Sequence, residues 1–540
     1  MLSYRKLAMR VLGRPLHTGR IDSPRPASQR AAAFALTAAM LITLTAPAFA
    51  ETWYIENGDI TVKASGTEGK NTVSQGTNKD VVDTNTIITN QNKDTTSSHT
   101  VTIETNDKND KVEVTLKDVN IDTSSRNKAA VSVTGEGDTN IKLDGDNALK
   151  SDIYRSGIYG SGSGSLTISG GENDSLTAQG GSGANGISSS GSLTISGGTV
   201  TANGDDGGRG ISSSGSVTIS GGSTVTANGG SGTISGGDGI WSGGGVTISG
   251  GSTVTANGGN GGSLVGGSGI SNGGSLTVSD GTVTAKGGNG DSKDGYGGDG
   301  IRSGGVVTIS GNTVNAAGGY GGKVGGYGIC SFDRVGVAIS GGTVEAAGGN
   351  GSTGGGSGIY SSVIDLSGSL ELTAKAGSPN GKALSQRGYE LDLDTIKDKL
   401  GPGAKVTATD ANGETKQVST PRPVEPEESS SSSDGGSSAP SAPVSSLPGL
   451  TVTDKDGQRI SYTSTQSGNT LTVCVGRLTA SLHVSLAALR QLRAEGIETI
   501  AFQTVLCSTS LSVDELLAMG GEDAEAVLTH RLTDSSLTVG

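Results

Sequence analysis

Hydrophobic and polar residues alternate in short runs along most of the chain, and the runs recur at a regular interval from Gly157 to about Ala374. Each repeat has Gly-Ile, a few small residues, Leu/Val-Thr-Ile-Ser-Gly-Gly and then Thr-Val-Thr-Ala-Asn-Gly-Gly. The isoleucines of the Gly-Ile pairs are separated by 29, 24, 29, 30, 31, 28 and 30 residues; they are Ile158, Ile187, Ile211, Ile240, Ile270, Ile301, Ile329 and Ile359. Repetition at this period is typical of a stacked, quasi-linear fold.

Within each repeat the alternation has a period of two, which indicates strands rather than helices. In the repeat that begins at Gly210, Val217, Ile219 and Val225 are expected to point inward, and the threonines between them outward. Three such runs for each repeat predict a mainly β protein, a right-handed parallel β-helix, with coils stacked about 4.8 Å apart. The 94 glycines are then expected at the corners, where positive φ angles and close backbone approaches are needed.

The composition changes along the chain and predicts five segments. Residues 1–50 have a basic leader, an apolar stretch and Ala48-Phe49-Ala50, the pattern of a secretory signal peptide. Residues 51–150 are expected to form the N-terminal cap and first coils, and residues 151–420 the repetitive β-helix with its C-terminal cap. Residues 421–448, rich in Pro, Ser and Glu, are expected to be a flexible linker. Residues 449–540 predict a small α+β accessory domain with an amphipathic helix after Val484.

Charge narrows the choice of partners. The whole chain has 39 basic and 52 acidic residues, and removal of residues 1–50 takes away seven basic residues and one acidic residue, which leaves 32 − 51 = −19. This balance argues against nucleic acid and anionic lipid as partners and favours a soluble secreted protein, with no membrane contact after signal cleavage. It also predicts that an acidic ligand would need a bridging cation.

Three cysteines exclude an even disulfide framework. Cys474 and Cys507 lie close together in the sequence of the C-terminal region and could pair in an oxidising compartment, whereas Cys330 lies in the repeat and is expected to be free. The chain has no CxxC pair, and the three histidines beyond the leader are scattered, so a zinc site is not expected.

Three segments together resemble a known family: TWYIENGDITV after the leader, TNIKLDGDNALKS before the first repeat, and the GI…LTISGGTVTA turns. The chain is similar over about residues 51–400 to the secreted bacterial carbohydrate-binding β-helix family of clostridia and their relatives, of which one type binds polygalacturonate and carries calcium. The resemblance implies a right-handed β-helix and pectin-type binding. Residues 449–540 lie outside it.

The residue after each repeated isoleucine should face outward, and this column contains the best candidates for ligand binding. An exposed aromatic ring can stack on the apolar C–H face of a sugar, which points to Trp241, with Tyr159 and Tyr360 as flanking platforms. Arg302, in the same column, could hold a carboxylate with its planar fork. The alternative is that all four are ordinary surface residues of a β-helix.

Aspartates gather in the glycine-rich loops and are candidate calcium ligands, because Ca²⁺ takes six to eight oxygens that stacked loops could supply. The candidates are Asp205, Asp206, Asp238, Asp291, Asp294 and Asp299. Calcium could then bridge an acidic polysaccharide to this acidic protein. The alternative is that these carboxylates are solvated charges that keep the rod soluble.

We therefore expect a secreted, non-catalytic carbohydrate-binding protein that recognises a polysaccharide, with acidic, pectin-like polymers among the candidates. A cell-surface adhesin or structural rod is the first alternative, in which the C-terminal domain could contact wall or surface components. A β-helix lyase or hydrolase is the second, although its clustered acid and base residues are not apparent. An ice-binding array of Thr194, Thr218, Thr247, Thr277 and Thr308 is a further possibility.

Overall fold

The computed structural model describes residues 51–421 except Glu68 and residues 333–335, and residues 450–539 with gaps at 455–458, 461, 468, 476–478, 505–507, 520–524 and 531–534. The expected signal peptide and nearly all of the expected linker lie outside the described residues. The chain divides into two compact units, Met1–Glu425 and Pro426–Gly540. Within the described residues, no helix is long and apolar enough to cross a membrane.

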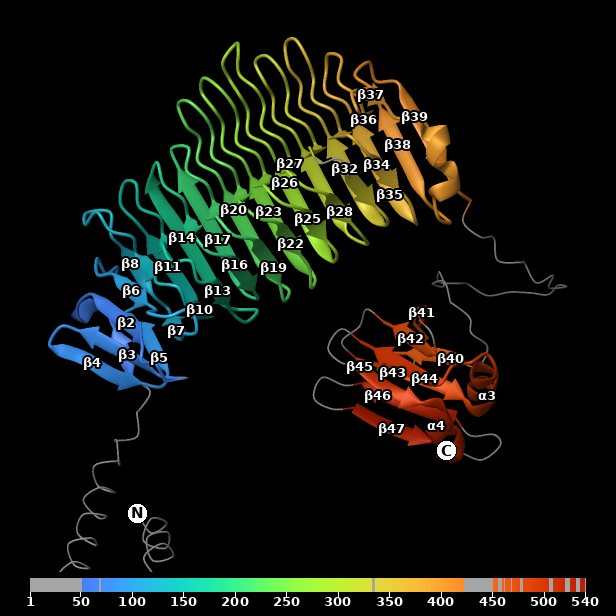
Figure 1. The fold of residues 1–540 in the computed structure, drawn as a ribbon, viewed down its shortest axis with the longest axis horizontal. Helices are drawn as coiled ribbons and strands as arrows, with labels where there is room; N and C mark the ends of the chain where they lie inside the picture. Colours follow the sequence, from blue (N-terminus) through green and yellow to red (C-terminus); the bar gives the residue numbers. More distant parts are fainter. Residues whose placement is uncertain are drawn as a thin grey trace, which may run out of the picture. The chain divides into compact units, whose positions relative to one another are not determined.

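The first unit is the predicted parallel β-helix, in which the coils from β7 onward contribute strands to each of three sheets (Figure 1). Sheet A has twelve strands: β1 (Thr52–Tyr54), β5 (Thr86–Thr89), β7 (Lys111–Lys117), β10 (Asp138–Asp144), β13 (Leu166–Ser169), β16 (Leu193–Ser196), β19 (Val217–Ser220), β22 (Val246–Ile248), β25 (Leu276–Val278), β28 (Val307–Ile309), β31 (Val337–Ile339) and β34 (Ile364–Leu366).

Sheet B has fifteen strands: β4 (Asn78–Asp83), β3 (Asn71–Gln75), β2 (Ile60–Ala64), β6 (Val101–Glu104), β9 (Val131–Thr134), β12 (Ile158–Gly160), β15 (Ile187–Ser189), β18 (Ile211–Ser213), β21 (Ile240–Ser242), β24 (Ile270–Asn272), β27 (Ile301–Ser303), β30 (Ile329–Ser331), β33 (Ile359–Ser361), β36 (Leu384–Gln386) and β37 (Tyr389–Glu390). Sheet C has twelve: β8 (Asn120–Asp122), β11 (Asp146–Lys150), β14 (Ser175–Ser182), β17 (Thr199–Asp205), β20 (Thr224–Asn228), β23 (Ser252–Asn257), β26 (Gly281–Lys286), β29 (Thr313–Ala317), β32 (Gly342–Ala347), β35 (Leu370–Lys375), β38 (Lys405–Thr409) and β39 (Thr415–Ser419).

The repeated isoleucines are the register marks of sheet B, as the sequence predicts. Each pairs in parallel with the next, from Ile158 to Ile359, and all are fully buried. Val and Ile of sheet A and Val and Ala of sheet C fill the rest of one continuous core. Because the inward residues are stacked coil over coil, the core is an aliphatic column that runs the length of the unit.

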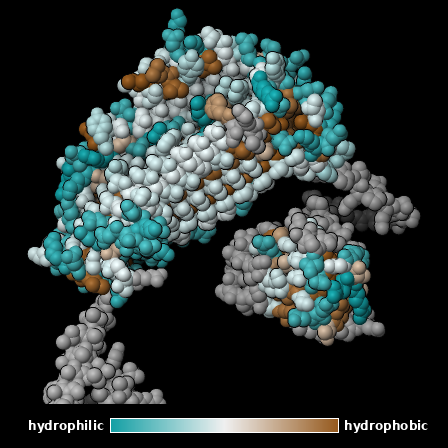
Figure 2. Space-filling model, viewed as in Figure 1, coloured by the Kyte–Doolittle hydropathy of each residue, from teal (hydrophilic) through white to brown (hydrophobic). Residues whose placement is uncertain are grey.

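The outward positions of sheets A and C are columns of small polar residues. Thr194, Thr218, Thr247, Thr277 and Thr308 stand in register in sheet A. Figure 2 shows the surface over these two sheets as a pale band of intermediate hydropathy, as Thr, Ser and Gly give.

Antiparallel strands close both ends of the unit, as expected from the composition. At the N-terminal end β2, β3 and β4 form an antiparallel meander. At the other end β38 and β39 form a hairpin across Asn412 and Gly413. A short 3-10 helix, η2 (Leu393–Lys399), precedes this hairpin, and a second one, η1 (Ile55–Asn57), lies in the N-terminal cap. The cap strands cover edges that would otherwise be open to pairing with other chains.

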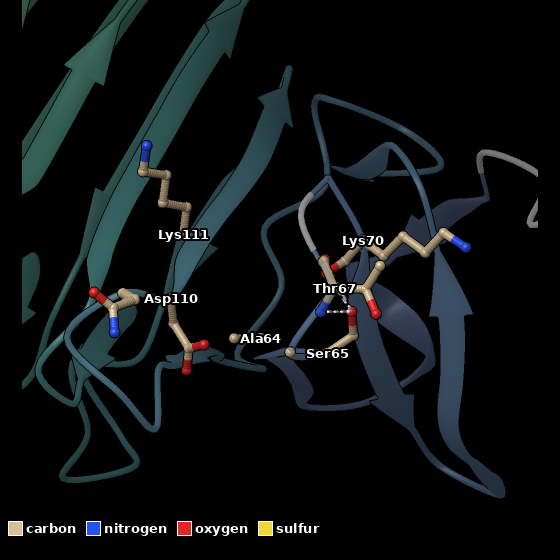
Figure 3. Close-up of a pocket in the computed structure, with 8 residues that line it drawn as sticks. Ala64, Ser65, Thr67, Lys70, Asp110 and Lys111 are labelled. Carbon is tan, nitrogen blue, oxygen red and sulfur yellow. Dashed lines mark hydrogen bonds between the residues drawn. The ribbon is translucent and has the colours of Figure 1, made fainter.

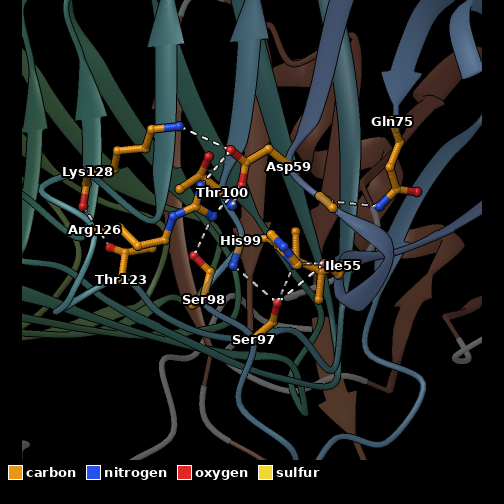
Figure 4. A network of polar contacts seen from close by, with 11 residues as sticks. Ile55, Asp59, Gln75, Ser97, Ser98, His99, Thr100, Thr123, Arg126 and Lys128 are labelled. Atoms are coloured by element: carbon orange, nitrogen blue, oxygen red, sulfur yellow. Dashed lines mark hydrogen bonds and ion pairs between the residues drawn. The ribbon is translucent and has the colours of Figure 1, made fainter. Parts of the chain in front are cut away.

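Charged and polar side chains tie the N-terminal cap to the first full coil (Figure 4). Asp59 accepts hydrogen bonds from Arg126 through both oxygens, at 2.7 and 3.0 Å, and from the backbone N–H of Thr100 at 3.0 Å. Lys128 Nζ lies 3.1 Å from the same carboxylate. Partial burial alone would raise the pKa of Asp59, but these hydrogen bonds outweigh it and lower the pKa to about 2.

Long glycine-rich loops connect sheet C to sheet B in the middle of the unit and stand side by side in Figure 1. We call them the glycine loops; they are residues 229–239, 258–269, 287–300, 318–328 and 348–358. Their backbones form a hydrogen-bonded relay between successive loops, for example from Gly288 N to Gly267 O and from Gly319 N to Gly298 O, each at 2.8 Å. The loops are therefore ordered largely by backbone contacts.

The second unit is the small α+β domain expected at residues 449–540. One sheet holds β40 (Leu450–Thr453), β43 (Ala480–Ser485), β46 (Glu525–His530) and β47 (Ser535–Val539). The other holds β41 (Thr463–Ser467), β42 (Thr470–Cys474), β44 (Thr499–Gln503) and β45 (Ser508–Ser512). The helices are α3 (Leu486–Ala494), with Leu486, Leu489 and Leu492 buried on one side, and α4 (Val513–Met519), where Ser512 Oγ accepts the Glu515 N–H.

Candidate functional site

The register of sheet B brings three of the four candidate ligand-binding residues into one stretch of a single column. Trp241, Ser271, Arg302, Cys330 and Tyr360 are successive partners on β21, β24, β27, β30 and β33. Tyr159 stands in the same column, but Ser188 and Ser212 separate it from Trp241. Tyr159 is 44% exposed and has no aromatic partner within the described part of the chain.

A second row of functional side chains lies two positions before each isoleucine, at the end of the preceding loop. In this row Arg209 lies beside Trp241, with its guanidinium carbon 4.4 Å from the ring centroid. Its Nε is 3.3 Å from Asp238 Oδ2. The stacked guanidinium limits the positions that the indole ring can take, and the carboxylate limits those of the guanidinium.

Around Arg302 the two rows join into an aromatic cluster. The rings of Tyr327 and Tyr360 are stacked with centroids 4.8 Å apart, and Phe332 lies 6.4 Å from Tyr360. The Arg302 guanidinium lies 4.9 Å from the centroid of Phe332, and its Nη1 is 3.4 Å from Asp299 Oδ2. We call the set Arg209, Trp241, Arg302, Tyr327, Phe332 and Tyr360 the aromatic strip.

Asp238 and Asp299 each contact an arginine and a backbone N–H group of the next coil. Asp238 Oδ1 accepts the backbone N–H of Ser268, and Asp299 Oδ1 accepts that of Tyr327, both at 2.8 Å. Burial raises the pKa of Asp238, and it raises the pKa of Asp299 to about 6 against the opposing effects of Tyr327 N–H and Arg302. Each carboxylate therefore links one coil to the next and positions an arginine of the strip.

One expectation about the column is wrong: its members are not all exposed. Within the column, Cys330 is fully buried and Ser212 nearly so. Phe332, which lies outside the column, is 53% exposed. Cys330 stands between Arg302 and Tyr360 in the ladder, where bulky neighbours cover its small side chain. Burial raises the pKa of its thiol well above the ordinary value, so the thiol is protonated and unreactive.

The aspartates proposed as calcium ligands are divided between two settings. Asp238 and Asp299 are largely buried in the contacts just described, and the Asp238 carboxylate contributes to the raised pKa of Asp299. Asp205, Asp206, Asp291 and Asp294 are exposed on the loops. Within the described residues, no three His, Cys, Asp or Glu side chains come close enough to hold a metal ion. A calcium site here would thus need backbone carbonyls or ligand carboxylates.

The proposed Cys474–Cys507 disulfide stays a prediction, because Cys507 lies outside the described residues. Cys474 Sγ lies 3.5 Å from Gln503 Oε1 on the neighbouring strand. Sequence reasoning missed Arg209, Tyr327 and Phe332. The first two could have been found, because both directly precede the Gly-Ile pair that marks each repeat.

No family model matches the chain, and neither the curated proteins nor the solved structures include a match. The function of this chain must therefore be inferred from its own residues.

Asp299 gives a testable pH dependence. Its pKa of about 6 lies above the ordinary aspartate value, so the folded state binds more protons than the unfolded state between about pH 4 and 6. The stabilisation from its protonated form is complete below about pH 4 and is lost as the pH rises through about 6. We expect the free energy of unfolding to fall over this range by less in Asp299→Asn, as measured by urea unfolding at each pH. Equal slopes in both proteins would contradict this assignment.

Proposed function

We propose that this protein is a secreted, non-catalytic carbohydrate-binding β-helix that holds a polysaccharide along the aromatic strip of sheet B. The observation that supports the proposal is the grouping of four aromatic rings and two arginines on the coils between β18 and β33. Rings of this kind present flat apolar surfaces to the C–H faces of sugars. The resemblance of residues 51–400 to a carbohydrate-binding family supports the same function.

The length of the strip suits a polymer rather than a single sugar. Trp241 and Tyr360 are four coils apart, or roughly 19 Å at the usual strand spacing. A chain that follows the axis of the solenoid could stack one unit on Trp241 and a later unit on Tyr360. Arg302, whose side chain is 54% exposed, lies between them and can donate hydrogen bonds to sugar hydroxyls or carboxylates.

The arginines change the expectation for acidic polysaccharides. Although the chain is strongly acidic overall, Arg209 and Arg302 place positive charge on the strip itself. A uronate could therefore bind here directly, and calcium bridging is a separate part of the proposal. Adding EDTA tests that part: binding that depends on calcium should be lost.

The central test is affinity electrophoresis of the wild-type protein and Trp241→Ala in gels that contain polygalacturonate, xylan or β-glucan. We expect the variant to bind the preferred polymer about tenfold more weakly, since it loses the stacking surface and the partner of Arg209. Thr247→Ala, on the outward face of sheet A, is the matched control and should migrate as wild type.

The outcomes separate the alternatives. If none of the polymers retards the wild-type protein, glycan binding fails and binding to whole cells would favour an adhesin. If the polymers are cleaved and products are released, the protein is an enzyme. If both variants are retarded like wild type, a polysaccharide binds, but the aromatic strip is not its site.

A further inference from the structure

A second hollow lies far from the aromatic strip in the sequence, where the N-terminal cap overhangs the first coils of sheet A. Its volume is about 430 Å³, within the range of small-ligand pockets. One wall consists of cap residues, chiefly Asn71 and Asn85. The floor is the outward face of β7, β10 and β13, with Lys111, Glu113, Asp138 and Asn140. We call this hollow the cap cleft.

The cleft exists because β5 is shorter than the strand it pairs with. β5 begins at Thr86, opposite Val114, whereas β7 already begins at Lys111. The three residues Lys111–Glu113 thus extend past β5, and the cap covers them only in part. Asn71 fixes the wall, because its Nδ2 donates to Glu113 O at 2.8 Å and to Thr86 Oγ1 at 3.0 Å.

The floor presents acceptors and donors that are only partly used. Glu113 Oε2 accepts Asn140 Nδ2 at 3.0 Å, and Asp138 Oδ1 accepts the N–H and the hydroxyl of Ser165. The other oxygen of each carboxylate makes no hydrogen bond with the described residues, and Lys111 makes no ion pair with them. Two free carboxylate oxygens beside one ammonium group match the vicinal hydroxyls of a sugar ring.

A neighbouring hollow of about 340 Å³ shares Lys111 with the cleft. Figure 3 shows that the ammonium groups of Lys70 and Lys111 point away from each other. The cap cleft therefore contains one cation with two carboxylates, a balance that favours a polyhydroxylated ligand over an anion.

We propose that the cap cleft binds the terminal sugar unit of a glycan chain. The cap closes the cleft on one side, while the outward columns of sheet A continue on the other side, so a chain can enter along sheet A but cannot pass through. This inference extends the proposed function to a second face of the same unit. The two sites would differ in what they recognise: the strip contacts the middle of a chain and the cleft contacts its end.

The test measures binding of short and long oligosaccharides of β-glucan and xylan to the full chain by titration calorimetry. We expect binding at the cleft to scale with the concentration of chain ends and not with chain length. Glu113→Gln, which keeps the shape but removes the charge, should weaken binding of the short oligosaccharides about tenfold. Thr218→Ala on the same sheet is the control and should bind as wild type, and circular dichroism checks that both variants are folded.

The variants also separate the two sites. Trp241→Ala should weaken long-chain binding while it leaves short-oligosaccharide binding intact, so failure of the strip and failure of the cleft give different results. The cleft proposal is overturned if Glu113→Gln binds short oligosaccharides as tightly as wild type. It is also overturned if binding to Trp241→Ala scales with total sugar rather than with chain ends, or if no short oligosaccharide binds the wild-type protein.

Discussion

Replacing Ile270 with Ala is expected to destabilise the middle of the solenoid by about 2–5 kcal/mol. Ile270 is fully buried and stands between Ile240 and Ile301 in the register of sheet B. Truncation removes the transfer free energy of three carbon atoms and leaves a cavity. Because the neighbouring coils are fixed by their own hydrogen bonds, they cannot collapse fully into that cavity.

Hydrogen exchange is the appropriate measurement, because each coil of a solenoid contacts only its neighbours and the loss should be greatest nearby. Relative to the wild-type protein, we expect the substitution to accelerate exchange more in β21, β24 and β27 than in the terminal coils. Thr277→Ala, an outward residue of the same coil, is the matched control and should change exchange little. A uniform increase along the whole unit would contradict the picture of a linear stack of coils.

The coarse fold could be predicted from the sequence because the same residues that define the repeat also build the core. Ile240 and Ile270 occupy the same inward position of successive coils and pair with each other. Because this position recurs once in each coil, it also marks the repeat in the sequence. The alternation of Val217 and Ile219 with threonine likewise follows from the pleat of a strand with one buried face. A pattern of period two therefore determines both the strand and its direction of burial.

The candidate site could be predicted only in part. Trp241, Arg302 and Tyr360 share the position after the isoleucine, so the ladder alone brings them together. Tyr327 also has a fixed position, directly before the Gly-Ile pair, but Phe332 comes from the loop after β30, and a linear pattern does not show where a loop directs its side chains. The cap cleft escaped prediction for a related reason, because it depends on the difference in length between β5 and β7.

The glycines show a second limit of sequence reasoning, which places both positive φ angles and close backbone approaches at the corners between strands. Two physical reasons operate in different places. At Gly311 the φ angle is +75°, and a Cβ would meet no atom within 4 Å, so the conformation requires glycine. At Gly298 a Cβ would lie 2.0 Å from Gly267 O, so the close packing of the glycine loops requires it. Glycine thus occurs in this chain for two different structural reasons.

These causes predict different costs for the same substitution. Gly311→Ala should destabilise the unit by about 1 kcal/mol, the usual cost of a left-handed conformation for a residue with a Cβ. Gly298→Ala should cost about 3 kcal/mol, since the clash is with backbone that is itself hydrogen-bonded to the adjacent loops. Urea unfolding gives the two free energies, and hydrogen exchange should show faster exchange at Gly288 and Gly319 in Gly298→Ala alone.

Gly311→Asn supplies the control that separates the two causes, because asparagine tolerates the left-handed region better than alanine does. It should recover part of the stability lost in Gly311→Ala, whereas Gly298→Asn should be at least as damaging as Gly298→Ala. If both positions responded alike to Ala and to Asn, backbone conformation alone would explain the glycines. The relay of hydrogen bonds between the glycine loops would then be a consequence of their conformation and not the reason for their composition.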